Sequence, residues 1–207
     1  IAAGAIEAGI TSLRSSVRLS DAGRSPRLQV RSRQLLAEAL IHSLRGLDEE
    51  GLAHLHEADR LAHEAGDPVG SARARTELGY VDFLRARYDR AELWLTQAIT
   101  LADTSPAVRA AATSFLGSVH SDRGSYPRAL DLLHEALRVS RAEGEHRRAA
   151  YTLSMLGRIH LIRGDLDLAA EHLDAAVELT ERERWLSFLP WPQALQGELF
   201  LQQDDPG

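Results

Sequence analysis

A short motif recurs three times along the chain at an almost constant spacing, and this period restricts the fold more than any other feature. Each copy begins with a Leu-Gly pair, and the three pairs begin at positions 78, 116 and 156. If the leucine is position i, alanines follow at i+13 and i+20, with a second leucine at i+17. A fixed period of this length is the signature of stacked, similar units. The three copies are Leu78-Gly79, Ala91, Leu95 and Ala98; Leu116-Gly117, Ala129, Leu133 and Ala136; and Leu156-Gly157, Ala169, Leu173 and Ala176.

Apolar residues within each copy recur at steps of three and four, which indicates helices rather than strands. Two helices cross closely only where glycine or alanine stands at the crossing, and larger residues fill the space between units. The pattern resembles the tetratricopeptide repeat family, whose unit pairs a helix A with a helix B. The resemblance implies an all-α fold, a right-handed α-solenoid of antiparallel helix pairs. The repeat of this chain has a period of 38 to 40 residues, which exceeds the usual length of a tetratricopeptide repeat, about 34 residues.

Capping residues and glycines divide the chain into repeats of one predicted solenoid domain over residues 1–207. The dipeptides Asp67-Pro68 and Ser105-Pro106 predict helix starts, and Gly124 and Gly164 predict breaks between helix A and helix B. In the first full repeat, Glu38 stands where the repeat leucine is expected. The abrupt ends indicate a fragment of a larger protein. We expect a half repeat at 1–21, full repeats at about 28–66, 67–104, 105–144 and 145–184, and a half repeat at 185–207.

Composition excludes several kinds of chemistry. The chain has no cysteine and no lysine, which removes thiolate chemistry, a P-loop and Schiff-base catalysis. The formal net charge of -6 argues against direct contact with nucleic acid. No run of about 18 apolar residues is present, so no membrane contact is predicted. We therefore predict a non-catalytic domain without a cofactor, in the cytoplasm, because the lack of cysteine fits a reducing compartment.

Nine histidines raise the question of a metal site. His54 and His56 are two residues apart and point to different sides of a helix, so they cannot share a metal ion. None of the His-Glu pairs has a second histidine at the spacing that a zinc-protease helix requires. We predict no metal site. Three other histidines occupy one repeat position and are interpreted as packing residues, with a pH-sensing row as the alternative: His42, His120 and His160.

The resemblance implies a binding groove, because helix A of each repeat lines the concave side in this family. Arginines, aromatic rings and small hydroxyl residues supply charged forks, flat faces and adaptable hydrogen bonds for a protein, a peptide or a polar small molecule. The alternative is that several of them are ordinary solvent-facing residues. The predicted groove residues are Arg73, Thr76, Tyr80, Phe83, Ser114, Ser118, Ser121, Tyr151, Ser154, Arg158 and Trp191.

The long period also resembles the repeat region of the large ATP-binding LuxR-family regulators and their maltose-regulator relatives. In those bacterial transcriptional regulators, an NTPase module precedes the repeats and a helix-turn-helix domain follows them. The resemblance implies that this segment senses a signal by binding a ligand or partner. Two other classes stay open, a free-standing protein scaffold and a peptide-pheromone receptor.

Overall fold

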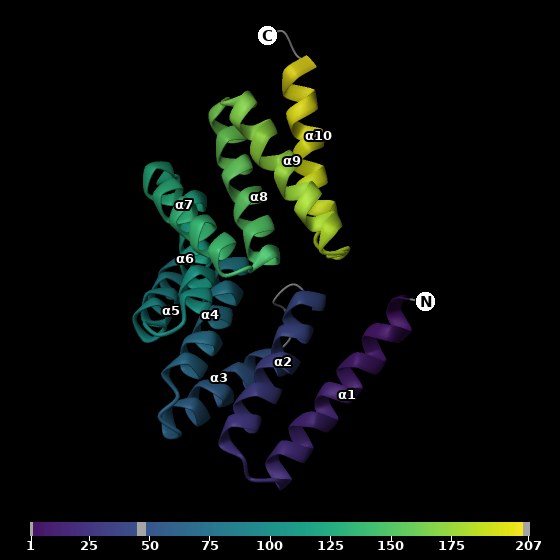
Figure 1. Cartoon of the computed structure of the whole chain (residues 1–207), viewed down its shortest axis with the longest axis vertical. Helices are drawn as coiled ribbons and strands as arrows, with labels where there is room; N and C mark the ends of the chain where they lie inside the picture. Colours follow the sequence, from purple (N-terminus) through teal and green to yellow (C-terminus); the bar gives the residue numbers. More distant parts are fainter. Residues whose placement is uncertain (1, 45–48, 205–207) are drawn as a thin grey trace. The chain divides into compact units, whose positions relative to one another are not determined.

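The computed structural model describes residues 2–44 and 49–204, and these residues form helices without any strand (Figure 1). The predicted all-α class is confirmed. Within each unit, helices that follow one another in the chain pack side by side, and the described connections between them are short. The helices are α1 (Ala2–Ala22), α2 (Pro26–Leu44), α3 (Glu49–Glu64), α4 (Pro68–Leu84), α5 (Tyr88–Leu101), α6 (Pro106–Asp122), α7 (Tyr126–Ala142), α8 (His146–Arg163), α9 (Leu166–Arg182) and α10 (Pro190–Asp204).

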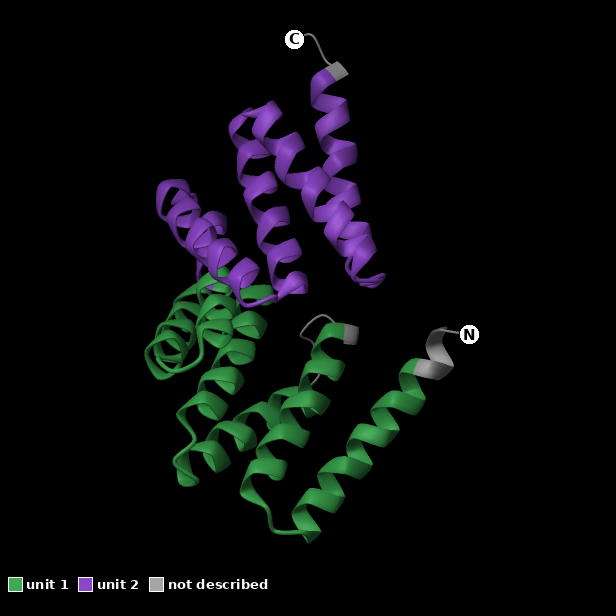
Figure 2. Cartoon of the chain, in the orientation of Figure 1, with its two compact units in different colours: residues 1–115 green, residues 116–207 purple. Residues whose placement is uncertain are grey.

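The chain divides into two compact units, residues 1–115 and residues 116–207 (Figure 2). The division falls within α6. Helix pairs α2/α3 and α4/α5 lie in the first unit, and the pair α8/α9 lies in the second with α10 packed beside it. The single continuous solenoid over the whole chain stays a prediction.

The predicted helix boundaries have a local cause at both ends. Asp67 caps α4, because its Oδ1 accepts a hydrogen bond of 2.8 Å from the backbone N–H of Gly70, and Pro68 takes the first helical position. Gly164 ends α8 with φ of 77°, in the left-handed region where a side chain would be strained. Both predictions are confirmed.

Each repeat glycine marks a close contact between helix A and helix B. A Cβ added to Gly79, Gly117 or Gly157 would lie 2.6 to 2.7 Å from the Cγ of a leucine on the next helix, which is too close for two carbon atoms. The three leucines are fully buried. The sequence predicted a contact with the small residues of helix B. The structure confirms this contact, because the added Cβ would lie 3.3 to 3.4 Å from the backbone carbonyl oxygen of Ala91, Ala129 or Ala169. It also shows a closer contact, with the leucine between the two alanines: Leu95, Leu133 or Leu173.

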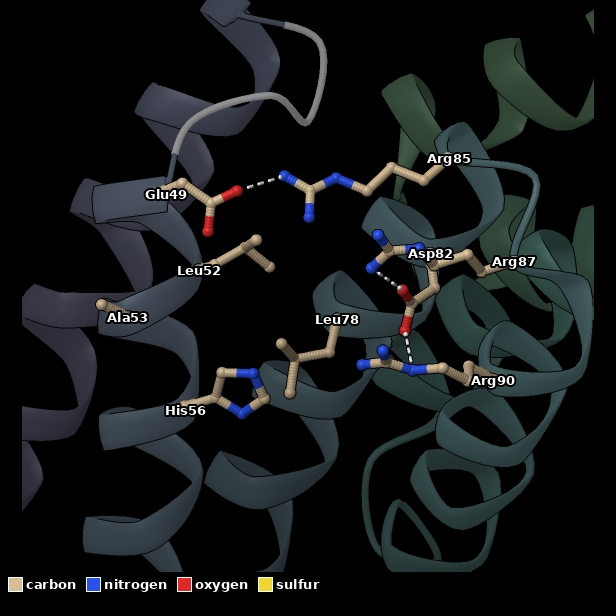
Figure 3. A pocket seen from close by; sticks show the side chains of 9 residues that line it. All are labelled: Glu49, Leu52, Ala53, His56, Leu78, Asp82, Arg85, Arg87 and Arg90. Atoms are coloured by element: carbon tan, nitrogen blue, oxygen red, sulfur yellow. Dashed lines mark hydrogen bonds and ion pairs between the residues drawn. The ribbon is translucent and has the colours of Figure 1, made fainter.

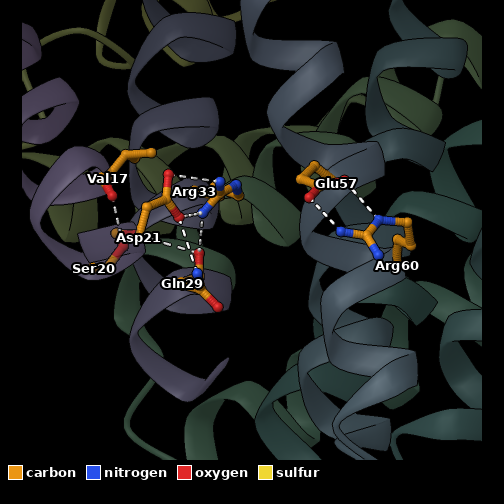
Figure 4. A network of polar contacts seen from close by, with 8 residues as sticks. Val17, Ser20, Asp21, Gln29, Arg33, Glu57 and Arg60 are labelled. Carbon is orange, nitrogen blue, oxygen red and sulfur yellow. Dashed lines mark hydrogen bonds and ion pairs between the residues drawn. The ribbon is translucent and has the colours of Figure 1, made fainter. Parts of the chain in front are cut away.

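Polar contacts join the first two helices of the first unit (Figure 4). Both terminal nitrogens of Arg33 on α2 donate to the carboxylate of Asp21 on α1, at 2.8 and 3.0 Å, and Gln29 Nε2 donates to the same carboxylate at 3.2 Å. The hydrogen bond from Arg33 lowers the pKa of Asp21 below its usual range. Ser20 and Ser32 share a buried hydrogen bond of 2.9 Å beneath this pair. The network fixes how α1 packs on α2.

Candidate functional site

The first unit carries five of the predicted groove residues, and only three of them have exposed surface. Arg73 is exposed, and Tyr80 and Phe83 are partly exposed on α4. Thr76 is buried and its Oγ1 donates to the Ala72 carbonyl at 2.8 Å. Ser114 is also buried. These two hydroxyl residues are packing residues in this structure, because an atom without exposed surface cannot contact a ligand.

An aromatic row runs along this face of the first unit. The ring of Tyr80 stacks on Phe115 with 4.4 Å between centroids and an interplanar angle of 21°. The ring centroid of Tyr80 is also 5.5 Å from that of His42 and 6.4 Å from that of Phe83. Phe115 is buried, so it fixes the plane of Tyr80 from beneath. The partly exposed rings of Tyr80 and Phe83 therefore form a rigid, flat surface.

A pair of carboxyl groups lies next to the aromatic row. Glu77 is largely buried, and its Oε2 is 3.5 Å from Nε2 of His42. Burial raises the pKa of Glu38 to about 7, and the nearby negative charge of Glu77 adds to the effect. Glu38 therefore carries only part of its charge at neutral pH.

In the second unit, most of the predicted hydroxyl residues are also buried. Ser118 and Tyr151 share a hydrogen bond of 3.0 Å between their oxygens. Ser154 Oγ donates to the Ala150 carbonyl at 3.0 Å, and Ser121 Oγ accepts a bond of 3.3 Å from Arg158. All three serines are buried, and Tyr151 is only 6% exposed. They position their neighbours rather than offer contact surface.

Arg158 and Trp191 keep accessible surface in the second unit. Nη1 of Arg158 also donates to Oδ1 of Asp122 at 2.8 Å, so its guanidinium is held in one place. The ring of Trp191 stacks on Tyr151, and Phe188 meets both rings at centroid distances of 6.0 and 5.5 Å. The structure thus brings Trp191 and Tyr151 together, as parts of one aromatic cluster.

Several members of that cluster were missed by the sequence prediction. Trp185 and Phe188 stack with 4.2 Å between centroids in the turn between α9 and α10. Two arginines at the start of α8 lie over the rings: Arg147 is 5.8 Å from the centre of Trp185, and Arg148 is 5.5 Å from the centre of Tyr151. The aromatic run from Trp185 to Trp191 in the sequence was the available signal.

The first unit has a cavity of about 330 Å³ where α3, α4 and the start of α5 meet (Figure 3). Asp82 lies buried in its wall and faces Arg87 and Arg90 at 3.8 and 3.3 Å. On another side, Arg85 donates to Glu49 at 3.0 Å. Leu52 and Leu78 form the apolar part of the wall, as Figure 3 shows. Because its arginines already face carboxylates, this cavity has little charge left for a ligand.

A second cavity, of about 950 Å³, lies in the first unit between the N-terminal halves of α2 and α4. Three arginines line it together with small, polar and apolar residues. Gln34 ties the two helices together beneath it, because its Nε2 donates to the Gly70 carbonyl at 2.8 Å. The lining residues are Ser25, Pro26, Arg27, Val30, Arg31, Gln34, Ala65, Asp67, Val69, Gly70 and Arg73.

Comparison with known proteins supports the repeat geometry. A family model described as tetratricopeptide repeat matches residues 108–182, which include two of the Gly–Leu contacts. This part of the chain is therefore similar to the tetratricopeptide repeat family. The tetratricopeptide repeat is a non-catalytic protein-interaction fold, and this part of the chain carries it.

Two other proteins are similar to this chain. The regulatory protein AfsR of Streptomyces griseus is 33% identical over 116 residues, which cover 55% of this chain and only 12% of AfsR. BtubC (BKLC) from P. vanneervenii superimposes with a TM-score of 0.67 over 96% of this chain and 87% of that chain, at 18% identity. At this identity, BtubC shows that the two chains share a fold and nothing more.

The histidines of the repeat chain fall into different environments. His160 is buried and its Nδ1 lies 3.3 Å from Oδ2 of Asp165, which fits the predicted packing role. His42 is exposed and does not fit it, although its ring lies beside Tyr80. Among residues 2–44 and 49–204, no three side chains are placed to hold a metal ion. Within the same residues, no helix is long and apolar enough to cross a membrane.

Proposed function

We propose that this chain is the sensor or interaction region of a bacterial signal-responsive transcriptional regulator. The identity to AfsR over 116 residues supports this proposal, together with the protein-interaction role of the repeat. The chain spans 12% of the length of AfsR, so the activity of a whole regulator comes to this chain only as a proposal. A regulator of this class would act in the cytoplasm, and the net charge of -6 leaves DNA contact to another domain.

The observation that carries the proposed binding role is a rigid aromatic surface beside charged groups in each unit. In the first unit it is the pair Tyr80 and Phe83, held from beneath by Phe115. In the second unit it is Trp191 and Phe188, and the same unit carries the fixed guanidinium of Arg158. Rigid rings bind with little loss of conformational entropy, and a fixed guanidinium adds a charged hydrogen bond. A peptide segment of a protein partner suits such a surface.

A selected peptide tests this role without knowledge of the natural partner. Peptides selected from a display library against the chain should lose about ten- to a hundredfold in affinity when a side chain of the surface that they bind is replaced by alanine, because each change removes a contact of about 1–3 kcal/mol. These side chains are Tyr80 and Phe83 in the first unit and Arg158 in the second. The exposed Arg138 on α7 provides a matched control, Arg138→Ala. The measurement is the dissociation constant together with the melting temperature of each variant.

Two results would count against the surface. If every variant bound the selected peptide as tightly as the parent chain, the binding surface would lie elsewhere. If the three variants unfolded while Arg138→Ala did not, these side chains would be packing residues. The parent reading frame separates the regulator from the alternatives: an upstream P-loop and a downstream helix-turn-helix support the regulator, and their absence favours a free-standing scaffold or a peptide receptor.

A further inference from the structure

Three arginines surround the larger cavity of the first unit. Arg27 and Arg31 stand one turn apart on α2, and Arg73 faces them from α4. All three side chains are exposed. The cavity of about 950 Å³ is at the upper end of the range for small-molecule sites. Three flexible guanidinium groups can therefore converge on one ligand there.

The charge of these arginines is not balanced within ion-pair distance. Elsewhere in the first unit, Arg33 reaches Asp21 at 2.8 Å and Arg75 reaches Asp59 at 3.0 Å. Within the described part of the chain, no carboxylate oxygen lies within 4.0 Å of Arg27, Arg31 or Arg73. The cavity is thus electropositive although the chain as a whole is acidic.

The acids nearest to the cavity do not remove this excess. Asp67 lines it, but its carboxylate is engaged as the cap of α4 through the N–H of Gly70. Arg31 and Arg73 interact electrostatically with the carboxyl group of Glu38. Burial raises the pKa of this carboxyl group to about 7, so that part of it is neutral at pH 7. Both α2 and α4 begin at this cavity, and neither has an acidic residue in its first turn. The positive end of the α2 dipole therefore adds to the arginines, whereas the Asp67 carboxylate offsets the positive end of α4.

We propose that this cavity binds a small phosphomonoester, such as a sugar phosphate or a nucleotide. A phosphate dianion offers three terminal oxygens for the three guanidinium forks, whereas a carboxylate offers two oxygens and one charge. Pro26, Val30 and Val69 give the wall an apolar part against which the organic group of the ligand packs. The site is distinct from the aromatic rings of Tyr80 and Phe83, so this inference goes beyond the proposed function and does not depend on it.

Calorimetric titration of the purified chain with glucose 6-phosphate and with glucuronate tests the proposal. Glucose 6-phosphate should bind, and glucuronate should bind at least tenfold more weakly. Replacing Arg27, Arg31 or Arg73 by glutamine should each weaken glucose 6-phosphate binding about tenfold or more, because one charged hydrogen-bond donor is lost. Added salt should weaken it as well. Arg18→Gln is the matched control, since Arg18 is an exposed arginine on α1 outside the cavity.

Four outcomes would overturn the proposal. In the first outcome, glucose 6-phosphate does not bind to the folded chain. In the second, glucuronate binds as tightly as glucose 6-phosphate, which would make the site a general carboxylate site. In a third outcome, Arg18→Gln weakens binding as much as the three cavity variants, which would indicate unspecific attraction. In the fourth, the cavity variants keep the circular dichroism spectrum of the parent chain and bind glucose 6-phosphate unchanged.

Discussion

Replacing Gly157 by leucine is expected to lower the free energy of unfolding of the second unit by about 1–3 kcal/mol, towards the upper end of that range. The first added atom, Cβ, would lie 2.6 Å from Cγ of the buried Leu173 and 3.4 Å from the carbonyl oxygen of Ala169. Leu173 is fully buried, and close packing in a protein interior leaves few voids into which a side chain can turn. Helices α8 and α9 must therefore move apart. Denaturant unfolding followed by circular dichroism measures the loss.

The chain contains its own control for this substitution. Gly197 on α10 occupies the position of Gly157 one period later, and a Cβ added there meets no atom within 4 Å. Gly197→Leu should therefore leave the unfolding free energy unchanged or raise it by up to about 1 kcal/mol, because leucine favours a helix more than glycine does. Equal losses at the two positions would show that helix packing does not distinguish them, and would contradict the repeat register.

Replacing Glu38 by glutamine is expected to stabilise the first unit by up to about 3 kcal/mol above pH 7, with no gain below about pH 4.5. Burial raises the pKa of Glu38 from 4.5 to about 7, and a pKa difference of one corresponds to about 1.4 kcal/mol. A carboxyl group whose pKa is raised on folding favours the folded state fully only below its unfolded pKa. Its contribution is lost as the pH rises through about 7. The gain from the substitution therefore grows between pH 4.5 and pH 7.

Unfolding free energies measured across this pH range check the prediction. Glu57 supplies a control, because the hydrogen bond from Arg60 lowers its pKa instead of raising it. Glu57→Gln should give no stabilisation above pH 7. If Glu38→Gln lowered the stability at pH 8, the carboxylate of Glu38 would be a favourable buried charge, and the assigned effect of burial would be wrong.

The repeat period made the architecture predictable, because it assigns each residue to a position in the repeat. Glu38 is an example. The positions of Leu78, Leu116 and Leu156 are core positions, and the period places Glu38 at the same position one repeat earlier. The sequence marked Glu38 as an irregularity of the repeat. The structure shows its consequence, a partly buried carboxyl group with a raised pKa.

The candidate site was less predictable than the fold, because exposure depends on how neighbouring helices pack. Ser114, Ser118 and Ser154 lie on the predicted helices, but small side chains let the neighbouring helices approach and cover them. Trp185 and Phe188 lie in a turn, for which the helical repeat makes no prediction. The cavity lined by Arg27, Arg31 and Arg73 could not be predicted from the sequence, since only the structure shows which arginines face a carboxylate.

Hydrogen–deuterium exchange of the chain, with and without its selected peptide, tests the central claim most directly. The claim is that partners bind the helix A surfaces that carry the rigid aromatic rings. We predict that bound peptide slows exchange in α4 around Tyr80 and Phe83, or in α8 and α10 around Arg158 and Trp191, and leaves α5 and α9 unchanged. Slower exchange confined to α5 or α9, with α4, α8 and α10 unaffected, would contradict the account.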